Sequence, residues 1–162
     1  MASVRGISRR AVVAAVLGLT VLLGCGEEDE ETPAACVAPA DTYVDALADA
    51  PDPVLLEGST PISDCLTRDQ DPAELGEIGE EMIAAATELN ADARRDPAGE
   101  ATVELGYLIG AAQEGAAQSG GIHADLLRRL DVAARFNEGG EPLPASFERS
   151  FGEGYAAGQE AG

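Results

Sequence analysis

The sequence predicts an all-α fold, a small bundle of four to five short helices. Apolar residues along most of the chain recur at helical spacing. Clusters of glycine and proline divide the chain into segments of ordinary helix length. No stretch alternates between apolar and polar residues as a half-buried strand would. The bundle is predicted to hold one disulfide and to follow an N-terminal targeting segment and a flexible acidic spacer.

Residues 38–50 are predicted to form the first helix. Five side chains in or just before this segment share one face: Cys36, Ala40, Tyr43, Val44 and Leu47. Pro51 and Pro53 end the helix. Residues 54–61 are then expected to be extended or irregular, and residues 62–66 return Cys65 to the body of the domain.

The second helix is predicted to begin at Asp69 to Pro72, because acids and a proline suit a helix N-terminus. It ends near the basic pair Arg94 and Arg95. Its apolar side chains keep the helical period: Leu75, Ile78, Met82, Ala86 and Leu89. A third helix is predicted from Pro97 to about Gln118, where serine and two glycines break it.

Two more helices complete the predicted bundle. Ile122, Leu126, Leu130 and Ala133 line the fourth, which ends between Asn137 and Gly139. The fifth spans Pro144 to Gly158 and carries an aromatic stripe of Phe147, Phe151 and Tyr155. Such a stripe can anchor a peptide or ligand. In a chain with few large apolar residues, packing into the core is the favoured interpretation.

The chain is strongly acidic. It has 30 Asp and Glu against 10 basic residues, all arginine, and a formal net charge of −20. Residues 1–24 hold three of the arginines and no acid, so the remainder carries −23. Nucleic acid binding requires a basic surface that displaces phosphate counterions, so no nucleic-acid partner is expected. The same charge should hold the domain away from anionic headgroups.

Large apolar residues are scarce. Leu, Ile, Val and Phe number 25 of the 138 residues after position 24. That fraction is close to the composition at which a highly charged chain becomes disordered. Either the domain is only marginally stable, or something besides apolar burial supports the fold. A third possibility is that the chain stays largely disordered until it binds a partner.

Cys36 and Cys65 are the natural source of that support. In an exported protein, two cysteines that remain after the targeting segment most simply form a disulfide. Closing a loop of about 30 residues is worth about 3.6 kcal/mol in the chain-entropy model. The alternative is a metal site of both cysteines, His123 and a carboxylate. Structural zinc prefers ligand pairs that are close in sequence, so no metal is predicted.

The N-terminus has the parts of a secretory signal. Arginines at positions 5, 9 and 10 precede an uncharged stretch from Ala11 to Leu23, which is too short to span a bilayer. Leu22-Leu23-Gly24-Cys25 resembles the lipobox of bacterial lipoproteins. The resemblance covers residues 1–25 and implies cleavage before Cys25, lipid on its thiol (palmitate among the acyl groups), and anchoring to a membrane outside the cytoplasm.

The signal leaves the export route open. Ser8-Arg9-Arg10 also resembles a twin-arginine export motif, although paired arginines are common in ordinary signals as well. The domain organisation predicted is a signal at 1–24, an acidic flexible tether at 25–35 and a helical domain at 36–162. The tether has many acids and no large apolar side chain, so it should be solvated and extended.

One short motif occurs twice. Gly106-Tyr107-x-x-Gly110 in the third helix repeats as Gly154-Tyr155-x-x-Gly158 in the fifth. Glycines four residues apart lie on one helix face and allow another backbone to approach closely. The favoured interpretation is that the two helices cross at these motifs. The other is that they form the seam of a homodimer or a partner interface.

Catalytic signals are weak, and no catalytic residue or cofactor is predicted. His123 is the only histidine, and no nucleophile stands in a recognisable motif with it. Asp69, Asp71 and Glu80 faintly match a calcium loop, but Glu74 occupies the position of its turn glycine. A helix N-terminus explains these acids better.

These observations favour a non-enzymatic, membrane-anchored lipoprotein of the cell envelope. It would act as a binding or scaffolding module that presents an acidic helical surface to an envelope protein or to a second copy. The alternative is a small hydrolase or ligand-binding lipoprotein with a site between helices that includes His123.

Overall fold

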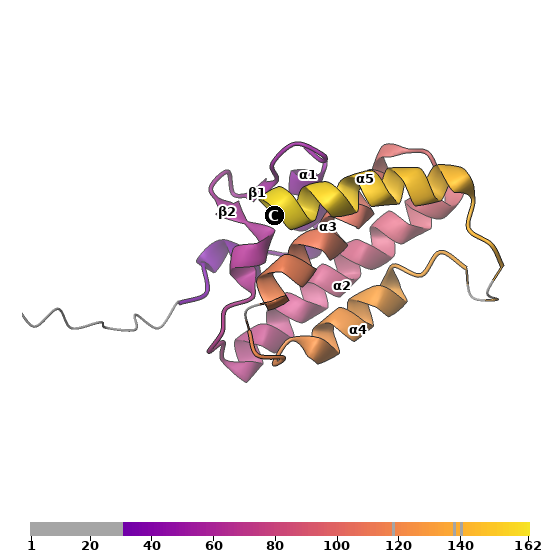
Figure 1. Cartoon of the computed structure of the whole chain (residues 1–162). Coiled ribbons are helices and arrows are strands. Elements are labelled where there is room, and N and C mark those ends of the chain that lie inside the picture. Colours follow the sequence, from indigo (N-terminus) through magenta and orange to yellow (C-terminus); the bar gives the residue numbers. More distant parts are fainter. Residues whose placement is uncertain (1–30, 118, 138, 140) are drawn as a thin grey trace, which may run out of the picture.

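The computed structural model describes residues 31–117, 119–137, 139 and 141–162 and shows the predicted helical bundle (Figure 1). The helices of the described chain are α1 (Ala40–Leu47), α2 (Pro72–Arg95), α3 (Glu100–Ala117), α4 (Ala124–Ala133) and α5 (Ala145–Ala161). Two 3-10 helices, η1 (Ala34–Val37) and η2 (Ile62–Cys65), and one hairpin of β1 (Leu55–Leu56) and β2 (Thr60–Pro61) accompany them. The all-α fold class is confirmed.

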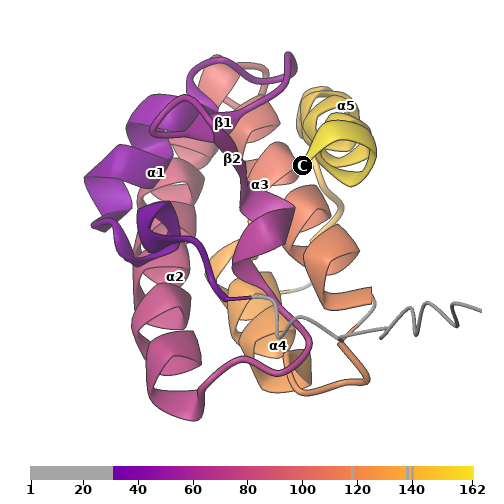
Figure 2. The same cartoon turned by 90° about the vertical axis from the view of Figure 1, so that its left-hand side faces the viewer.

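Helix α3 lies at the centre of the bundle. It contacts α2, α4, α5 and η2, and Figure 2 shows α4 and α5 on different sides of it. Every residue from Leu105 to Ala112 is buried, and none of them is charged. A helix buried on all sides must be apolar on all sides. Small residues in this stretch let its neighbours approach closely, which compensates for the scarcity of large side chains.

Helix α1 is shorter than the predicted segment 38–50, and Cys36 lies in η1 instead of on the same helical face. The chain turns at Pro39, whose side chain cannot cap the new helix. The Ala40 N–H instead donates to Oε2 of Glu81 on α2 at 2.8 Å. A carboxylate at this position also suits the positive end of the helix dipole.

Helix α2 has both predicted termini. The Asp71 side chain accepts hydrogen bonds from the first N–H groups of the helix, and two arginines lie in its last turn. Helix α3 begins at Glu100, later than the predicted Pro97. Asp96 forms a turn of its own, because its Oδ1 accepts from the Ala98 N–H and its carbonyl from the Gly99 N–H.

Helix α4 is also shorter than predicted. Gly120 and Gly121 have φ values of +67° and +94°, which only glycine adopts easily, and the helix starts at Ala124. Ile122 was expected to line its inner face but is 47% exposed, and the adjacent His123 is fully buried in its place. Leu126 and Leu130 are buried as predicted.

The predicted extended segment contains a small hairpin. Leu55 pairs with Pro61 and Leu56 with Thr60, around a loop of Glu57, Gly58 and Ser59. Leu56 is fully buried while Leu55 is exposed, so one face of the hairpin covers the core. Two residues per strand are too few for the alternation of apolar and polar residues to be visible in the sequence.

Candidate functional site

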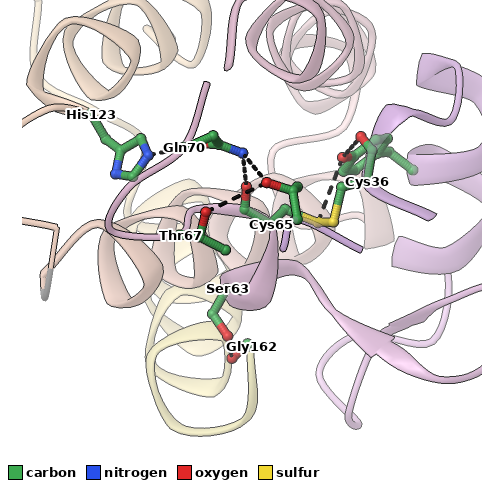
Figure 3. The surroundings of a disulfide bond; sticks show 9 residues. Cys36, Ser63, Cys65, Thr67, Gln70, His123 and Gly162 are labelled. Carbon is green, nitrogen blue, oxygen red and sulfur yellow. Dashed lines mark hydrogen bonds between the residues drawn. A yellow bond between two sulfur atoms is a disulfide. The ribbon is translucent and has the colours of Figure 1, made fainter. Parts of the chain in front are cut away.

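The disulfide joins the two 3-10 helices, η1 and η2. Cys36 and Cys65 are joined by an S–S bond of 2.00 Å, with their Cα atoms 5.4 Å apart, and both are fully buried (Figure 3). The Tyr43 hydroxyl donates to the Cys36 carbonyl at 2.6 Å. Burial and the nearby charge of Glu81 raise the pKa of Tyr43, so it keeps its proton and the hydrogen bond. The predicted disulfide is confirmed by this geometry.

A chain of polar side chains extends from the disulfide toward α4. The Gln70 Nε2 donates to the Cys65 carbonyl at 2.8 Å and to the Thr32 Oγ1 at 3.1 Å. The Gln70 Oε1 lies 3.0 Å from the Nε2 of His123 (Figure 3). The Thr32 hydroxyl is also 3.4 Å from that of Thr67. Packing therefore begins at Thr32, four residues before the predicted start of the domain at Cys36.

These contacts determine which ring nitrogen of His123 carries the proton. A carbonyl only accepts, so the Gln70 amide must place its nitrogen toward Cys65 and its oxygen toward the imidazole. The Nε2 of His123 therefore carries the proton, and its buried Nδ1 has no partner in the described chain. Burial lowers the pKa of His123, because a charged ring there would lose its hydration. The ring is a neutral, fully buried structural group in this arrangement.

The two metal alternatives do not assemble. Both cysteines of the proposed zinc set are used by the disulfide. Asp71, part of the faint calcium pattern, is the N-cap of α2 and accepts from the Ala73 N–H at 2.8 Å. Within the described ranges no three metal-ligating side chains gather.

The repeated glycine motif lies at the crossing of α3 and α5. A Cβ atom at any of the four glycines would overlap a backbone carbonyl oxygen of the facing helix. The pairs are Gly106 with Phe151, Gly110 with Tyr155, Gly154 with Val103, and Gly158 with Tyr107. The crossing is within one chain and buries all four glycines. It therefore offers no glycine surface to a second molecule.

The motif tyrosines support the same crossing in different ways. The Tyr107 ring is fully buried, and its hydroxyl accepts from the Val54 N–H at 3.0 Å, which ties α3 to the chain before the hairpin. Tyr155 is half-buried on α5, and its hydroxyl donates to the Oε1 of Gln113 on α3. Both tyrosines are therefore structural.

The aromatic stripe packs only partly into the core. Phe147 is buried and lies 4.4 Å from Phe136 between ring centroids, while Phe151 and Tyr155 are half-buried. A hollow of about 710 Å³ between α4, α5 and their connection is lined in part by Phe136, Phe147 and Phe151. The stripe thus serves the core and also borders a surface hollow.

A second hollow lies between α2 and α4. Its volume is about 790 Å³, with Ile83, Val132 and Ala133 as its apolar part. Three arginines and two acids surround them: Arg128, Arg129, Arg135, Asp125 and Asp131. A neighbouring hollow of about 450 Å³ shares Val132, Ala133 and Arg135 and adds Arg94 and Asn90. We call this continuous surface the arginine groove.

Sequence reasoning missed the arginine groove, although a signal was present. Once Leu126 and Leu130 are placed inward, helical geometry places Arg128, Arg129 and Val132 outward. A valine on the polar face of a short helix is out of pattern, and Val132 is 60% exposed.

Cys25 lies outside the described residues. Within the described part of the chain, no helix is both long and apolar enough to cross a membrane. Comparisons with protein-family models, with curated proteins and with solved structures found no match.

Proposed function

We propose that this chain is a membrane-anchored lipoprotein of the cell envelope that acts as a non-enzymatic binding module. Lipid on Cys25 anchors it, and the bundle held by the disulfide presents a docking surface. The observation that carries the proposal is Val132, which is 60% exposed in a groove between two helices. Apolar side chains exposed in a groove mark interaction sites more often than isolated ones do.

The position of the groove supports this role. Thr32 contacts Gln70, just before the N-terminus of α2, while Arg94 lies in the last turn of the same helix. The 18 residues from Pro72 to Asn90 correspond to about 27 Å of helix. In Figure 1 the C-terminal ends of α2 and α4, which border the far end of the groove, lie on the opposite side of the body from the start of the described chain. A partner could approach the groove without displacing the anchor.

The alternative, a hydrolase or ligand site that uses His123, has less support. The ring is fully buried, and its one hydrogen bond goes to Gln70. A general base must reach the proton that it abstracts. The lowered pKa of His123 follows from burial in a packed interior, and a substrate has no access to the ring in this conformation.

The anchor is tested by metabolic labelling with an alkyne fatty acid in the native host. We expect label on the wild-type chain and none on Cys25→Ser. Cys36→Ser is the control, because it removes a different cysteine and opens the disulfide but should keep the label per molecule of protein. Label that persists on Cys25→Ser would exclude lipidation at this position.

The docking surface is tested by photo-crosslinking in native membranes. A diazirine amino acid placed at Val132 should give one dominant adduct with another protein. The same group at Ala156, an exposed position of α5, is the control and should give none. Adducts of equal yield at both positions, or none at Val132, would contradict the binding-module proposal.

A further inference from the structure

Most arginines of the domain are gathered on one face. Four of the seven that follow the signal border the arginine groove: Arg94, Arg128, Arg129 and Arg135. Two acids, Asp125 and Asp131, also border it. The groove is thus locally positive in a chain of net charge −20. Acids more than about 8 Å away are largely screened at physiological salt, so the local charge governs a bound partner.

Part of this positive charge is unpaired within the described part of the chain. Arg128 pairs with Asp125 at 3.0 Å, and Arg94 donates to the carbonyl of Arg135. The guanidinium groups of Arg129 and Arg135 make no hydrogen bond or ion pair with any described residue. With 30 acids in the sequence, a nearby carboxylate would be easy to provide. The two groups remain available to carboxylates from outside.

A buried side chain of α2 fixes the shape of the groove. Asn90 on α2 is 5% exposed, and its Nδ2 donates to the carbonyls of Ala133 and Arg135 at 2.7 and 3.0 Å. These two bonds fasten the C-terminal end of α4 to α2. A surface that is fixed before binding loses less conformational entropy when a partner docks.

We propose that the arginine groove binds an acidic amphipathic helical segment of a partner protein. Apolar side chains of that segment pack on Ile83 and Val132, and its carboxylates pair with Arg129 and Arg135. Arginine suits this role because its planar fork binds carboxylates bidentately. A groove between two helices that combines an apolar floor with charged borders fits an amphipathic helix. This inference rests on the proposed function and names its partner's chemistry.

The test uses full-length lipidated protein in a neutral detergent and a phage-displayed library of helical peptides with randomised side chains. We expect the enriched peptides to carry Glu or Asp beside apolar residues at helical spacing. One enriched peptide is then synthesised with its acids intact and again with Gln in their place. The substitution should weaken binding at least tenfold, and added salt should weaken binding of the acidic form only.

Two double variants make the comparison specific. Arg129→Gln with Arg135→Gln should lower the affinity for the acidic peptide about tenfold or more. Arg95→Gln with Arg149→Gln removes the same charge from positions that do not border the groove, and should change the affinity less than twofold. Thermal unfolding confirms that both variants remain folded.

Any of three outcomes would overturn the inference. The selection does not enrich acidic peptides, the Glu and Gln forms of the peptide bind equally well, or the two double variants lose the same affinity. No binding to the peptide, together with stronger binding to vesicles with 30% phosphatidylglycerol than to neutral vesicles that is lost in the Arg129→Gln with Arg135→Gln variant, would assign the groove to lipid headgroups. The proposed function is tested separately. A Val132 adduct with a protein that has no acidic segment would support the binding module but contradict an acidic helical partner.

Discussion

Gly154 on α5 faces the carbonyl oxygen of Val103 on α3 so closely that a Cβ atom on Gly154 would overlap it. The overlapping group is backbone, which cannot rotate away as a side chain can. Gly154→Ala must therefore separate the two helices along their crossing. We expect it to lower the free energy of unfolding by about 1–3 kcal/mol or more, measured by urea denaturation.

A matched control lies two residues earlier in the same helix. Gly152 is exposed, and a Cβ on it would meet nothing within 4 Å. Gly152→Ala should stabilise the protein by up to about 1 kcal/mol, because alanine favours helix more than glycine does. Equal effects of the two substitutions would show that the crossing does not depend on glycine at position 154.

The disulfide is expected to provide a large share of stability. Cys36 and Cys65 are 29 residues apart, and the chain-entropy model gives about 3.6 kcal/mol for such a loop. The double variant Cys36→Ala with Cys65→Ala should lose about 3–4 kcal/mol in urea denaturation. Reductant should shift the wild-type midpoint in the same direction and leave the double variant unchanged. A wild-type midpoint that reductant does not move would contradict this assignment.

Most of the helical pattern could be predicted because each helix carries local signals. The Asp71 cap with Pro72, and the paired arginines at the other end, predict both ends of α2 closely. Boundaries that depend on turns were predicted less well. The start of α3 is set by the Asp96 turn, and such local hydrogen bonds compete with helix extension in ways that periodicity does not reveal.

The binding surface was harder to predict than the fold. It consists of α2 and α4, and nothing in the sequence shows that Arg94 and Arg129 border the two adjoining hollows of one groove. Composition gives only the net charge of the whole chain, and that value does not reveal that the groove is locally positive. The role of His123 was also undetermined, because the hydrogen-bond partner of its buried ring is Gln70, which is 53 residues away.

A buried backbone group provides the next prediction. The Val54 N–H has the Tyr107 hydroxyl as its acceptor at 3.0 Å, in a fully buried environment. Tyr107→Phe leaves this N–H without a partner and should cost about 1–3 kcal/mol in urea denaturation. Tyr155→Phe is the control, since its ring is half-buried and water can replace the lost bond. A larger loss in the control than in Tyr107→Phe would contradict the proposed role of this bond.

His123 should make stability depend on pH in a defined direction. Burial lowers its pKa in the folded state, so the unfolded chain takes up the proton first as pH falls. The stability that neutral His123 provides is complete above its unfolded pKa of about 6.5. It declines as pH falls from there toward the folded pKa, by at most about 1.4 kcal/mol per pH unit.

Two measurements check this pH dependence. Urea denaturation of wild type and His123→Gln between pH 8 and pH 5 separates the histidine from the carboxylates, which both proteins share. The stability of wild type relative to the variant should fall below pH 6.5. Because the chain has one histidine, NMR can follow the titration of its ring protons without ambiguity. A folded-state pKa at or above 6.5 would mean that the ring is hydrated or paired with an acid, and that the buried bond to Gln70 does not hold it neutral.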